Sequence, residues 1–191
     1  MSSAPTLPIV SVDEYLNTSY EPDMEYVDGV LVEKGMPTIA HNFLGRLLLF
    51  WFAQYETAFR FTVMYDVRTQ IVERHRYRLP DIMLCPEPLP KGSLVNVVPW
   101  AVIEIVSPDD TIHKTRARFL DYSHLGVRHV LQMDPEDHVA HRFDNGSMIQ
   151  TQFTSLELPT GDVPFDSEKL FLRLAAELMS RRGANRAETA R

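Results

Sequence analysis

The chain has 191 residues, of which 45% are hydrophobic and 24% charged, and its formal net charge is −7. This balance is typical of one compact soluble domain that buries its own core, and it argues against a disordered chain. We expect a domain over residues 1–180 and an irregular basic tail over 181–191, which leaves the domain more acidic than the whole chain. A domain this acidic repels a polyanion unless its negative charge gathers where a cation neutralises it.

Three elements are predicted in the first third of the chain. Ser11 and Glu14 have the spacing of a capping box, which predicts a short helix. Asp28-Gly29 between two β-rich runs predicts a hairpin. Apolar residues at three- and four-residue spacing then predict the main core helix. The expected ranges are 12–18 and 38–59 for the helices, and 24–27 and 30–33 for the hairpin strands.

Strands alternate with helices over the rest of the chain. The segment around Glu104 is otherwise apolar on both faces, as in a central strand covered on both sides. Gly126 ends a basic helix, and Asp144-Asn145-Gly146 predicts a second hairpin turn. The expected ranges are strands at 61–72, 79–85, 97–106 and 127–133, a charged loop at 73–78, a helix at 111–125, hairpin strands at 138–143 and 147–153, a closing helix at 167–179, and an irregular segment from 180 onward.

Several common functions lack their sequence signals. The single cysteine, Cys85, excludes an intrachain disulfide, and no apolar run approaches the length of a membrane span. We find no glycine-rich phosphate loop, no G-x-S-x-G turn and no C-x-x-C pair. The expected location is the cytoplasm, and carboxylates, histidines and basic side chains are left to carry any chemistry.

Two carboxylates stand out. Glu104 lies inside an apolar strand, where an ionised group needs a hydrogen bond, a cation or a water-filled cleft. A buried salt bridge to Arg116 or Arg118 is the structural alternative. Asp81 lies at the start of the preceding strand, and an aspartate in this position, considered alone, is most simply interpreted as a turn residue. Together the two can converge on one hard divalent cation, and Glu25 on the first hairpin can add a third carboxylate.

The order of these residues resembles the Uma-type restriction endonuclease family, a branch of the PD-(D/E)-x-K nuclease superfamily. The resemblance covers roughly residues 11–180. Its motifs are weak singly and specific in this order and spacing. They are Glu25-Tyr26-Val27-Asp28-Gly29, His41 at a helix start, Pro80-Asp81, Val102-Ile103-Glu104-Ile105-Val106-Ser107-Pro108, Tyr122, Gly126-Val127 and Asp134-Pro135.

The resemblance implies both a fold and a chemistry. The fold is mixed α/β (α+β), a restriction-endonuclease-like core with a mixed central β-sheet flanked by helices and an N-terminal β-hairpin. The chemistry is hydrolysis of a phosphodiester in DNA that depends on Mg²⁺ or Mn²⁺. Asp81 and Glu104 match the metal ligands, and Ile105 would add its backbone carbonyl. Glu25 matches the acidic residue of the first hairpin, and His41 the histidine at the helix start.

The chain departs from the family pattern at its lysines. The superfamily lysine two residues after the glutamate is Val106 here, and the Uma-type lysine four residues before Tyr122 is Arg118. Arginine can stabilise negative charge on a phosphate through its bidentate fork, but it stays protonated and cannot act as a general base. Lys114, one helical turn earlier, is the second candidate for the catalytic cation.

Other polar residues are weaker candidates. Arg74, Arg76 and Arg78 alternate in the charged loop and, together with Arg116, are candidates to bind the phosphate backbone, although a charge run is more often a solvated connection. His138 and His141 are three residues apart in a predicted strand, so their rings face opposite sides and a shared metal is not expected.

Two hypotheses follow for the function. The first is a metal-dependent endonuclease that acts on DNA and forms a homodimer. The second is a catalytically inactive homodimer of the same fold that serves as a binding or regulatory module, and it predicts an ion pair from Arg118 to Glu104 or Asp81 in place of the metal. A hydrolase that uses histidine comes last, because the sequence offers no nucleophile with a positioned base.

Overall fold

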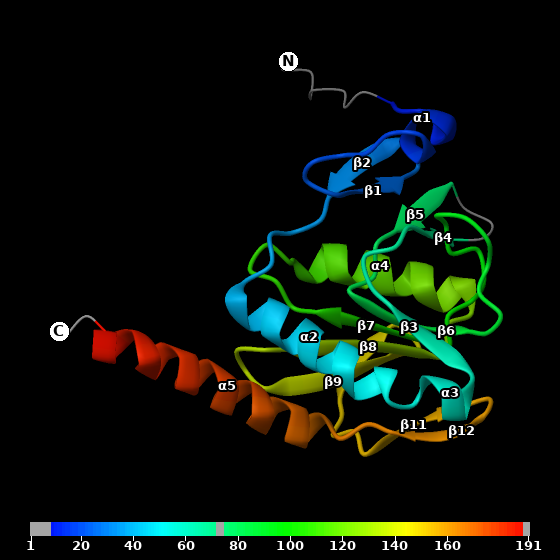
Figure 1. Ribbon diagram of the computed structural model, residues 1–191. Coiled ribbons are helices and arrows are strands. Elements are labelled where there is room, and N and C mark those ends of the chain that lie inside the picture. Colours follow the sequence, from blue (N-terminus) through cyan, green and yellow to red (C-terminus); the bar gives the residue numbers. More distant parts are fainter. Residues whose placement is uncertain (1–8, 72–74, 189–191) are drawn as a thin grey trace.

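The computed structural model describes residues 9–71 and 75–188, and a six-stranded sheet lies at its centre (Figure 1). The strand order is β10 (Ser147–Gln150), β9 (Val139–Asp144), β8 (His129–Asp134), β7 (Ala101–Ile105), β6 (Ile82–Pro86) and β3 (Phe61–Met64). The pair β7 and β8 is parallel and the other pairs of this sheet are antiparallel. The predicted mixed central sheet is therefore confirmed.

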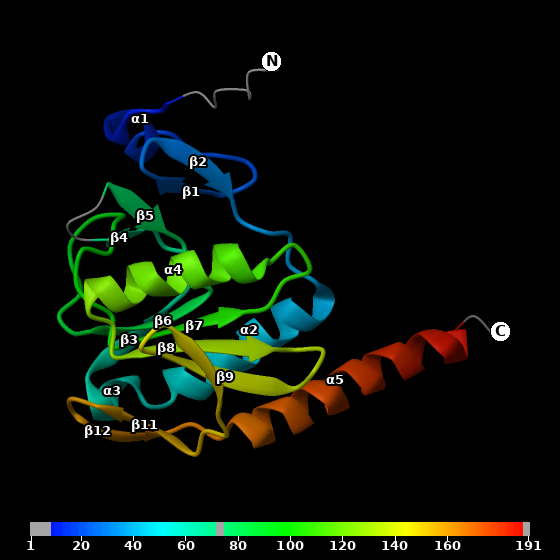
Figure 2. The ribbon, with the colours of Figure 1, turned by 180° about the vertical axis from the view of Figure 1, so that it is seen from behind.

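Helices cover both faces of this sheet (Figures 1 and 2). Helices α2 (Ile39–Ala53) and α5 (Ser167–Glu188) lie on one face, and α4 (Ile112–Leu125) lies on the other. A two-stranded sheet of β11 (Ser155–Leu158) and β12 (Gly161–Pro164) packs beside α2 and α5. Burial on both faces explains why β6 and β7 are almost wholly apolar, which makes the carboxylate of Glu104 in β7 exceptional.

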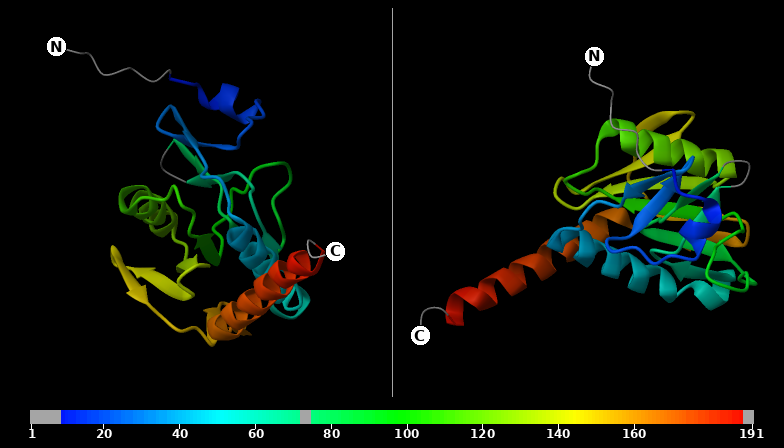
Figure 3. Two further views of the ribbon diagram at one scale, coloured as in Figure 1. Left: turned by 90° about the vertical axis from the view of Figure 1, so that its left-hand side faces the viewer. Right: turned by 90° about the horizontal axis from the view of Figure 1, so that it is seen from above.

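A second sheet lies beyond one end of the first (Figure 3). Its order is β2 (Val30–Glu33), β1 (Met24–Val27), β5 (Arg76–Arg78) and β4 (Thr69–Ile71), and it is antiparallel. Helix α1 (Val12–Leu16) packs on it through a cluster of tyrosines from α1, β1 and β5. Because β5 is followed almost at once by β6, the two sheets meet at residues 79–81, where Asp81 lies.

Several local predictions are confirmed. The hydroxyl of Ser11 accepts a hydrogen bond from the backbone of Glu14 at the start of α1. Asp28 and Gly29 have φ angles of 51° and 93°, the left-handed values that a two-residue hairpin of this kind requires. Gly126 ends α4 with a φ of 93°. The second hairpin, β9 and β10, also forms where it was expected.

Other predictions are wrong in part. The expected strand 61–72 is two strands in different sheets, because the chain turns at Asp66, whose φ is 49°. The expected loop 73–78 contains β5, whose arginines are held by buried carboxylates. The expected helix 38–59 breaks after Ala53, and its end is a separate short helix, α3 (Glu56–Phe59). Strands β11 and β12 were not predicted.

The C-terminal helix is longer than expected. Helix α5 continues to Glu188, through most of the segment predicted to be an irregular tail, and it projects away from the body of the molecule (Figures 1 and 3). The absence of an apolar period in this segment does not prevent a helix, because a helix that is already nucleated propagates through favourable residues such as alanine, arginine and glutamate.

Candidate active site

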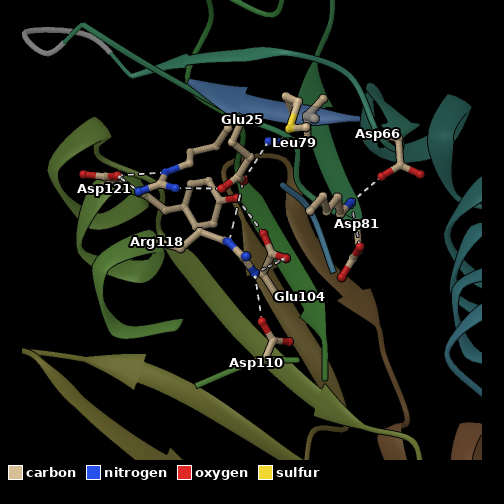
Figure 4. A network of polar contacts seen from close by, with 12 residues as sticks. Glu25, Asp66, Leu79, Asp81, Glu104, Asp110, Arg118 and Asp121 are labelled. Carbon is tan, nitrogen blue, oxygen red and sulfur yellow. Dashed lines mark hydrogen bonds and ion pairs between the residues drawn. The ribbon is translucent and has the colours of Figure 1, made fainter. Parts of the chain in front are cut away.

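Asp81 and Glu104 lie opposite each other where the two sheets meet (Figure 4). Strands β6 and β7 pair Ile82 with Ile103, so the next pair of this antiparallel register is Asp81 and Glu104. Both residues are buried, with relative exposures of 8% for Asp81 and 3% for Glu104. The predicted meeting of the two carboxylates is therefore built into the strand register.

Asp81 is surrounded by donors. Lys34 Nζ lies 2.8 Å from Asp81 Oδ1, and His41 Nε2 lies 3.4 Å from Asp81 Oδ2. The backbone N–H of Ile105 donates to Oδ2 at 2.7 Å. Burial alone would favour the neutral acid, but the hydrogen bond from His41 and the charge of Lys34 outweigh it and hold the pKa of Asp81 well below its usual range. Asp81 is thus ionised at neutral pH.

Glu104 has a different environment. The hydroxyl of Tyr122 in α4 donates to Glu104 Oε1 at 2.5 Å, and Arg118 Nη1 lies 3.3 Å from Oε2. Burial raises the pKa of Glu104 to about 8, against the opposing charge of Arg118 and with a further contribution from the negative charge of Asp81. The surroundings therefore favour the ionised form of Asp81 and the neutral form of Glu104.

The third predicted carboxylate, Glu25, belongs to a buried ion-pair network beside Glu104. Arg78 in β5 lies directly across from Glu25 in β1, and its Nη1 donates to Glu25 Oε2 at 2.6 Å. Arg78 also donates to Asp121 of α4 at 2.6 and 2.9 Å. Arg118 Nε lies 3.6 Å from Glu25 Oε1, and its Nη1 lies 3.7 Å from Asp110. This network ties α4 to both sheets.

Lys34 is the residue that the sequence interpretation missed. It follows β2 directly, and its ammonium forms ion pairs with both Asp81 and Asp66. A lone lysine between a strand and a helix normally faces solvent, so its type and position carry no strong signal. The useful clue is that it precedes the helix that begins near His41, since both residues then approach Asp81 from one connection.

The predicted phosphate-binding arginines lie elsewhere. Arg76 is paired with Asp28 and donates to Asp121 Oδ1 at 2.7 Å. Arg116 is exposed and lies near the turn at Gly146, in a different cavity from the carboxylates. Arg74 lies outside the described residues.

Two clefts flank the carboxylates. Lys114 is exposed and lines a cleft of about 480 Å³ together with Glu25 and Arg118. A second cleft, of about 220 Å³, is lined by Lys34, His41, Asp66 and Asp81 among others. Gly35 lines both clefts, so the connection from β2 to α2 passes between them.

Comparison with known proteins identifies the family. The family model Uma2, described as "Putative restriction endonuclease", matches residues 12–174. The chain belongs to this family. A crystal structure from Anabaena variabilis ATCC 29413, described as a putative nuclease belonging to DUF820, superposes with a TM-score of 0.72 at 18% sequence identity. The match covers 86% of this chain and 99% of that one, and shows a shared fold.

A search of curated proteins gave no match. Within residues 9–71 and 75–188, no helix has both the length and the apolar character needed to cross a membrane.

The carboxylate pair fits a hard cation with few protein ligands. Among the described residues, no three His, Cys, Asp or Glu side chains surround one point, which does not suit a structural zinc site. Mg²⁺ is commonly held by one or two carboxylates, with waters and substrate phosphate completing its shell. In this Uma2 family member Asp81 and Glu104 are the two carboxylates that such an ion would need, and Lys34 and Arg118 contact Asp81 Oδ1 and Glu104 Oε2.

Proposed function

We propose that this chain is a divalent-metal-dependent endonuclease that hydrolyses phosphodiester bonds in DNA. The observation that carries the proposal is that Asp81 and Glu104, both buried, lie next to the Ile82–Ile103 pair of β6 and β7, at the junction of the two sheets, in a member of a restriction endonuclease family. The family and the fold support a nuclease function, and the donor set supports Mg²⁺ or Mn²⁺ as the cofactor. The homodimer, the cytoplasmic location and Ile105 as a carbonyl ligand stay predictions.

The residues divide the work of the proposed reaction. A divalent cation held by Asp81 and Glu104 would supply positive charge at the scissile phosphate and a more acidic water. Water forms a new bond to phosphorus, the bond from phosphorus to the leaving oxygen breaks, and that oxygen takes a proton. Arg118 lies 3.3 Å from Glu104 and can stabilise charge on the phosphate, while Lys114 lines the adjoining cleft and can contact a neighbouring phosphate.

Metal binding and cleavage test this proposal together. Calorimetric titration with Mn²⁺ should show binding that disappears in Asp81→Ala and in Glu104→Ala. Supercoiled plasmid incubated with Mn²⁺ should be nicked or linearised by the wild-type protein and left intact by Glu104→Gln. Glu104→Gln removes the charge of a ligand with little change in shape, so a loss of cleavage at unchanged melting temperature points to chemistry. A wild-type protein that neither binds Mn²⁺ nor cleaves plasmid would refute the proposal.

One observation favours a second function. Arg118 pairs with Glu104 at 3.3 Å, as expected of a nuclease fold that has lost its metal and serves as a binding or regulatory module. Both side chains are largely buried, so removing one partner would leave the other without compensation in a site that excludes water. Cleavage that Glu104→Gln abolishes would eliminate this alternative, whereas a failure to bind any divalent ion would support it.

A further inference from the structure

Lys34 is a cation next to the carboxylate pair that the family pattern does not assign to the site. Its side chain is 17% exposed, and its Nζ contacts Asp81 Oδ1 at 2.8 Å and also pairs with Asp66. Its backbone N–H donates to the carbonyl of Asp23 at 3.2 Å, which fixes the base of the side chain at the end of the hairpin. Lys34 is therefore held in position by its ion pairs with Asp81 and Asp66, unlike a freely moving surface lysine.

The other cations near Asp81 and Glu104 pair with carboxylates that are themselves buried or nearly so. Arg78 is 5% exposed and donates to Glu25 and Asp121 at 2.6 to 2.9 Å, so moving it would uncover two buried carboxylates. Arg118 lies within 3.3 to 3.7 Å of Glu25, Glu104 and Asp110. Lys34, by contrast, has one partner exposed at the surface, Asp66, whose side chain is 48% exposed.

The cleft beside Lys34 has room for a phosphate. Its volume is about 220 Å³, and its lining includes the basic residues Lys34 and His41 together with four acidic residues, Glu21, Asp23, Asp66 and Asp81. Lys34 thus reaches Asp81 and this cleft, in the way that Arg118 reaches Glu104 and the wider cleft. The ion pair with Asp66 can keep its ammonium at the cleft if its contact with Asp81 is lost.

We propose that Lys34 is a catalytic lysine of this site, which competes with a divalent cation for Asp81 and contacts the phosphate of the substrate. The proposal rests on the proposed nuclease function. An ammonium and a divalent cation repel each other at the same carboxylate oxygen, so each weakens the binding of the other. A positive charge placed beside the phosphate stabilises the negative charge that develops in the transition state.

The test uses two measurements that should move in opposite directions in Lys34→Met. Removing the competing charge should tighten Mn²⁺ binding about tenfold by calorimetry. Losing the phosphate contact should lower the plasmid cleavage rate at saturating Mn²⁺ by about 100-fold. Lys34→Arg keeps the positive charge, so its Mn²⁺ affinity should stay within about threefold of wild type. The matched control is Lys91→Met, an exposed lysine in the loop between β6 and β7, which should change neither quantity.

Each outcome decides the inference. A lysine that only supports the fold would weaken metal binding and cleavage together in Lys34→Met and lower the melting temperature, which would overturn the proposal. Cleavage by Lys34→Met at the wild-type rate would overturn it while the nuclease function stood. If Lys34→Met does not fold, a Lys34→Arg protein with weakened Mn²⁺ binding would overturn it, and one with preserved binding and measurable cleavage would support it. A wild-type protein that neither binds Mn²⁺ nor cleaves plasmid would overturn both proposals.

Discussion

The two sides of the carboxylate pair are built in opposite ways. On the Glu104 side, arginines and carboxylates from β1, β5 and α4 form a buried network, with Asp121 fully buried and Arg78 5% exposed. On the Asp81 side, Lys34 directly follows β2, His41 lies in the first turn of α2, and both border a cleft.

The difference separates a fixed frame from an accessible side. A buried network resists change because moving one side chain leaves the charge of its partner buried without compensation. Lys34 also holds a buried carboxylate, Asp81, but its second partner, Asp66, is 48% exposed, so water and ligands can replace that contact at lower cost. The Glu104 side therefore fixes where the carboxylates lie, and under the proposed function the Asp81 side is where a divalent cation would exchange with Lys34.

The largest expected effect comes from breaking the buried network. Arg78→Met leaves Glu25 and Asp121 without their shared cation, and should lower the free energy of unfolding by about 3–5 kcal/mol. Urea denaturation followed by circular dichroism measures this loss. The matched control is Arg142→Met, whose pair with Asp144 is about half exposed on both sides and should contribute about 0–1 kcal/mol. An equal loss of unfolding free energy in the two variants would show that the buried network does not stabilise the fold more than an exposed ion pair does.

The pH dependence of stability should differ in sign between the two carboxylates. Folding raises the pKa of Glu104 from 4.5 to about 8, so the folded protein binds a proton there that the unfolded chain has lost. This contribution to stability is complete below the unfolded pKa and disappears as the pH rises through 8. In the metal-free protein, unfolding free energy should fall between pH 5 and pH 8 by more than about 1.4 kcal/mol, the value of one pKa unit.

Variants of each carboxylate sharpen the contrast. Glu104→Gln does not titrate, so its stability should stay nearly level from pH 5 to pH 8 in the same urea experiment. The pKa of Asp81 is lowered on folding, so its contribution is present above the unfolded value of 3.8 and is lost as the pH falls. Asp81→Asn should therefore reduce only the loss of unfolding free energy at acidic pH, and leave the change between pH 5 and pH 8 in place. A wild-type profile that rises from pH 5 to pH 8 would contradict the assignment of Glu104.

A smaller effect is expected from the hydrogen bond that Tyr122 donates to Glu104 at 2.5 Å. Tyr122→Phe keeps the buried ring and removes the donor, and should cost about 1 kcal/mol of unfolding free energy. The hydrogen bond favours the ionised form of Glu104, so its loss should move the pH transition upward. Tyr15→Phe, which loses a hydroxyl bonded to the Met24 carbonyl at 2.8 Å, is the control that should leave this transition in place.

Much of this fold follows from local sequence patterns, and the site follows less completely. The Asp28-Gly29 turn and the Gly126 helix end depend on backbone angles that few residues adopt, so both were predicted correctly. Asp81 and Glu104 were found because a carboxylate in an apolar strand is costly. Lys34 was not found, and Arg78 was taken as a candidate phosphate contact and not as a buried ion-pair partner, because the role of a cation in a connection or a charged run depends on a partner that is distant in the sequence. The resemblance to the family did not help there, since it directs attention to Val106 and Arg118.

The smallest expected effect distinguishes the two basic residues on α4. Lys114 is exposed and lines the cleft beside Glu25 and Arg118, whereas Arg116 faces the turn at Gly146. If the wide cleft holds the DNA backbone, Lys114→Ala removes about one phosphate contact. The slope of log affinity against log salt should then fall by about 1 for a short duplex, measured by fluorescence anisotropy with Ca²⁺. Arg116→Ala should keep the wild-type slope, because its side chain borders a different cavity. The reverse result would place the DNA on the side of α4 that faces β9 and β10, away from both carboxylates.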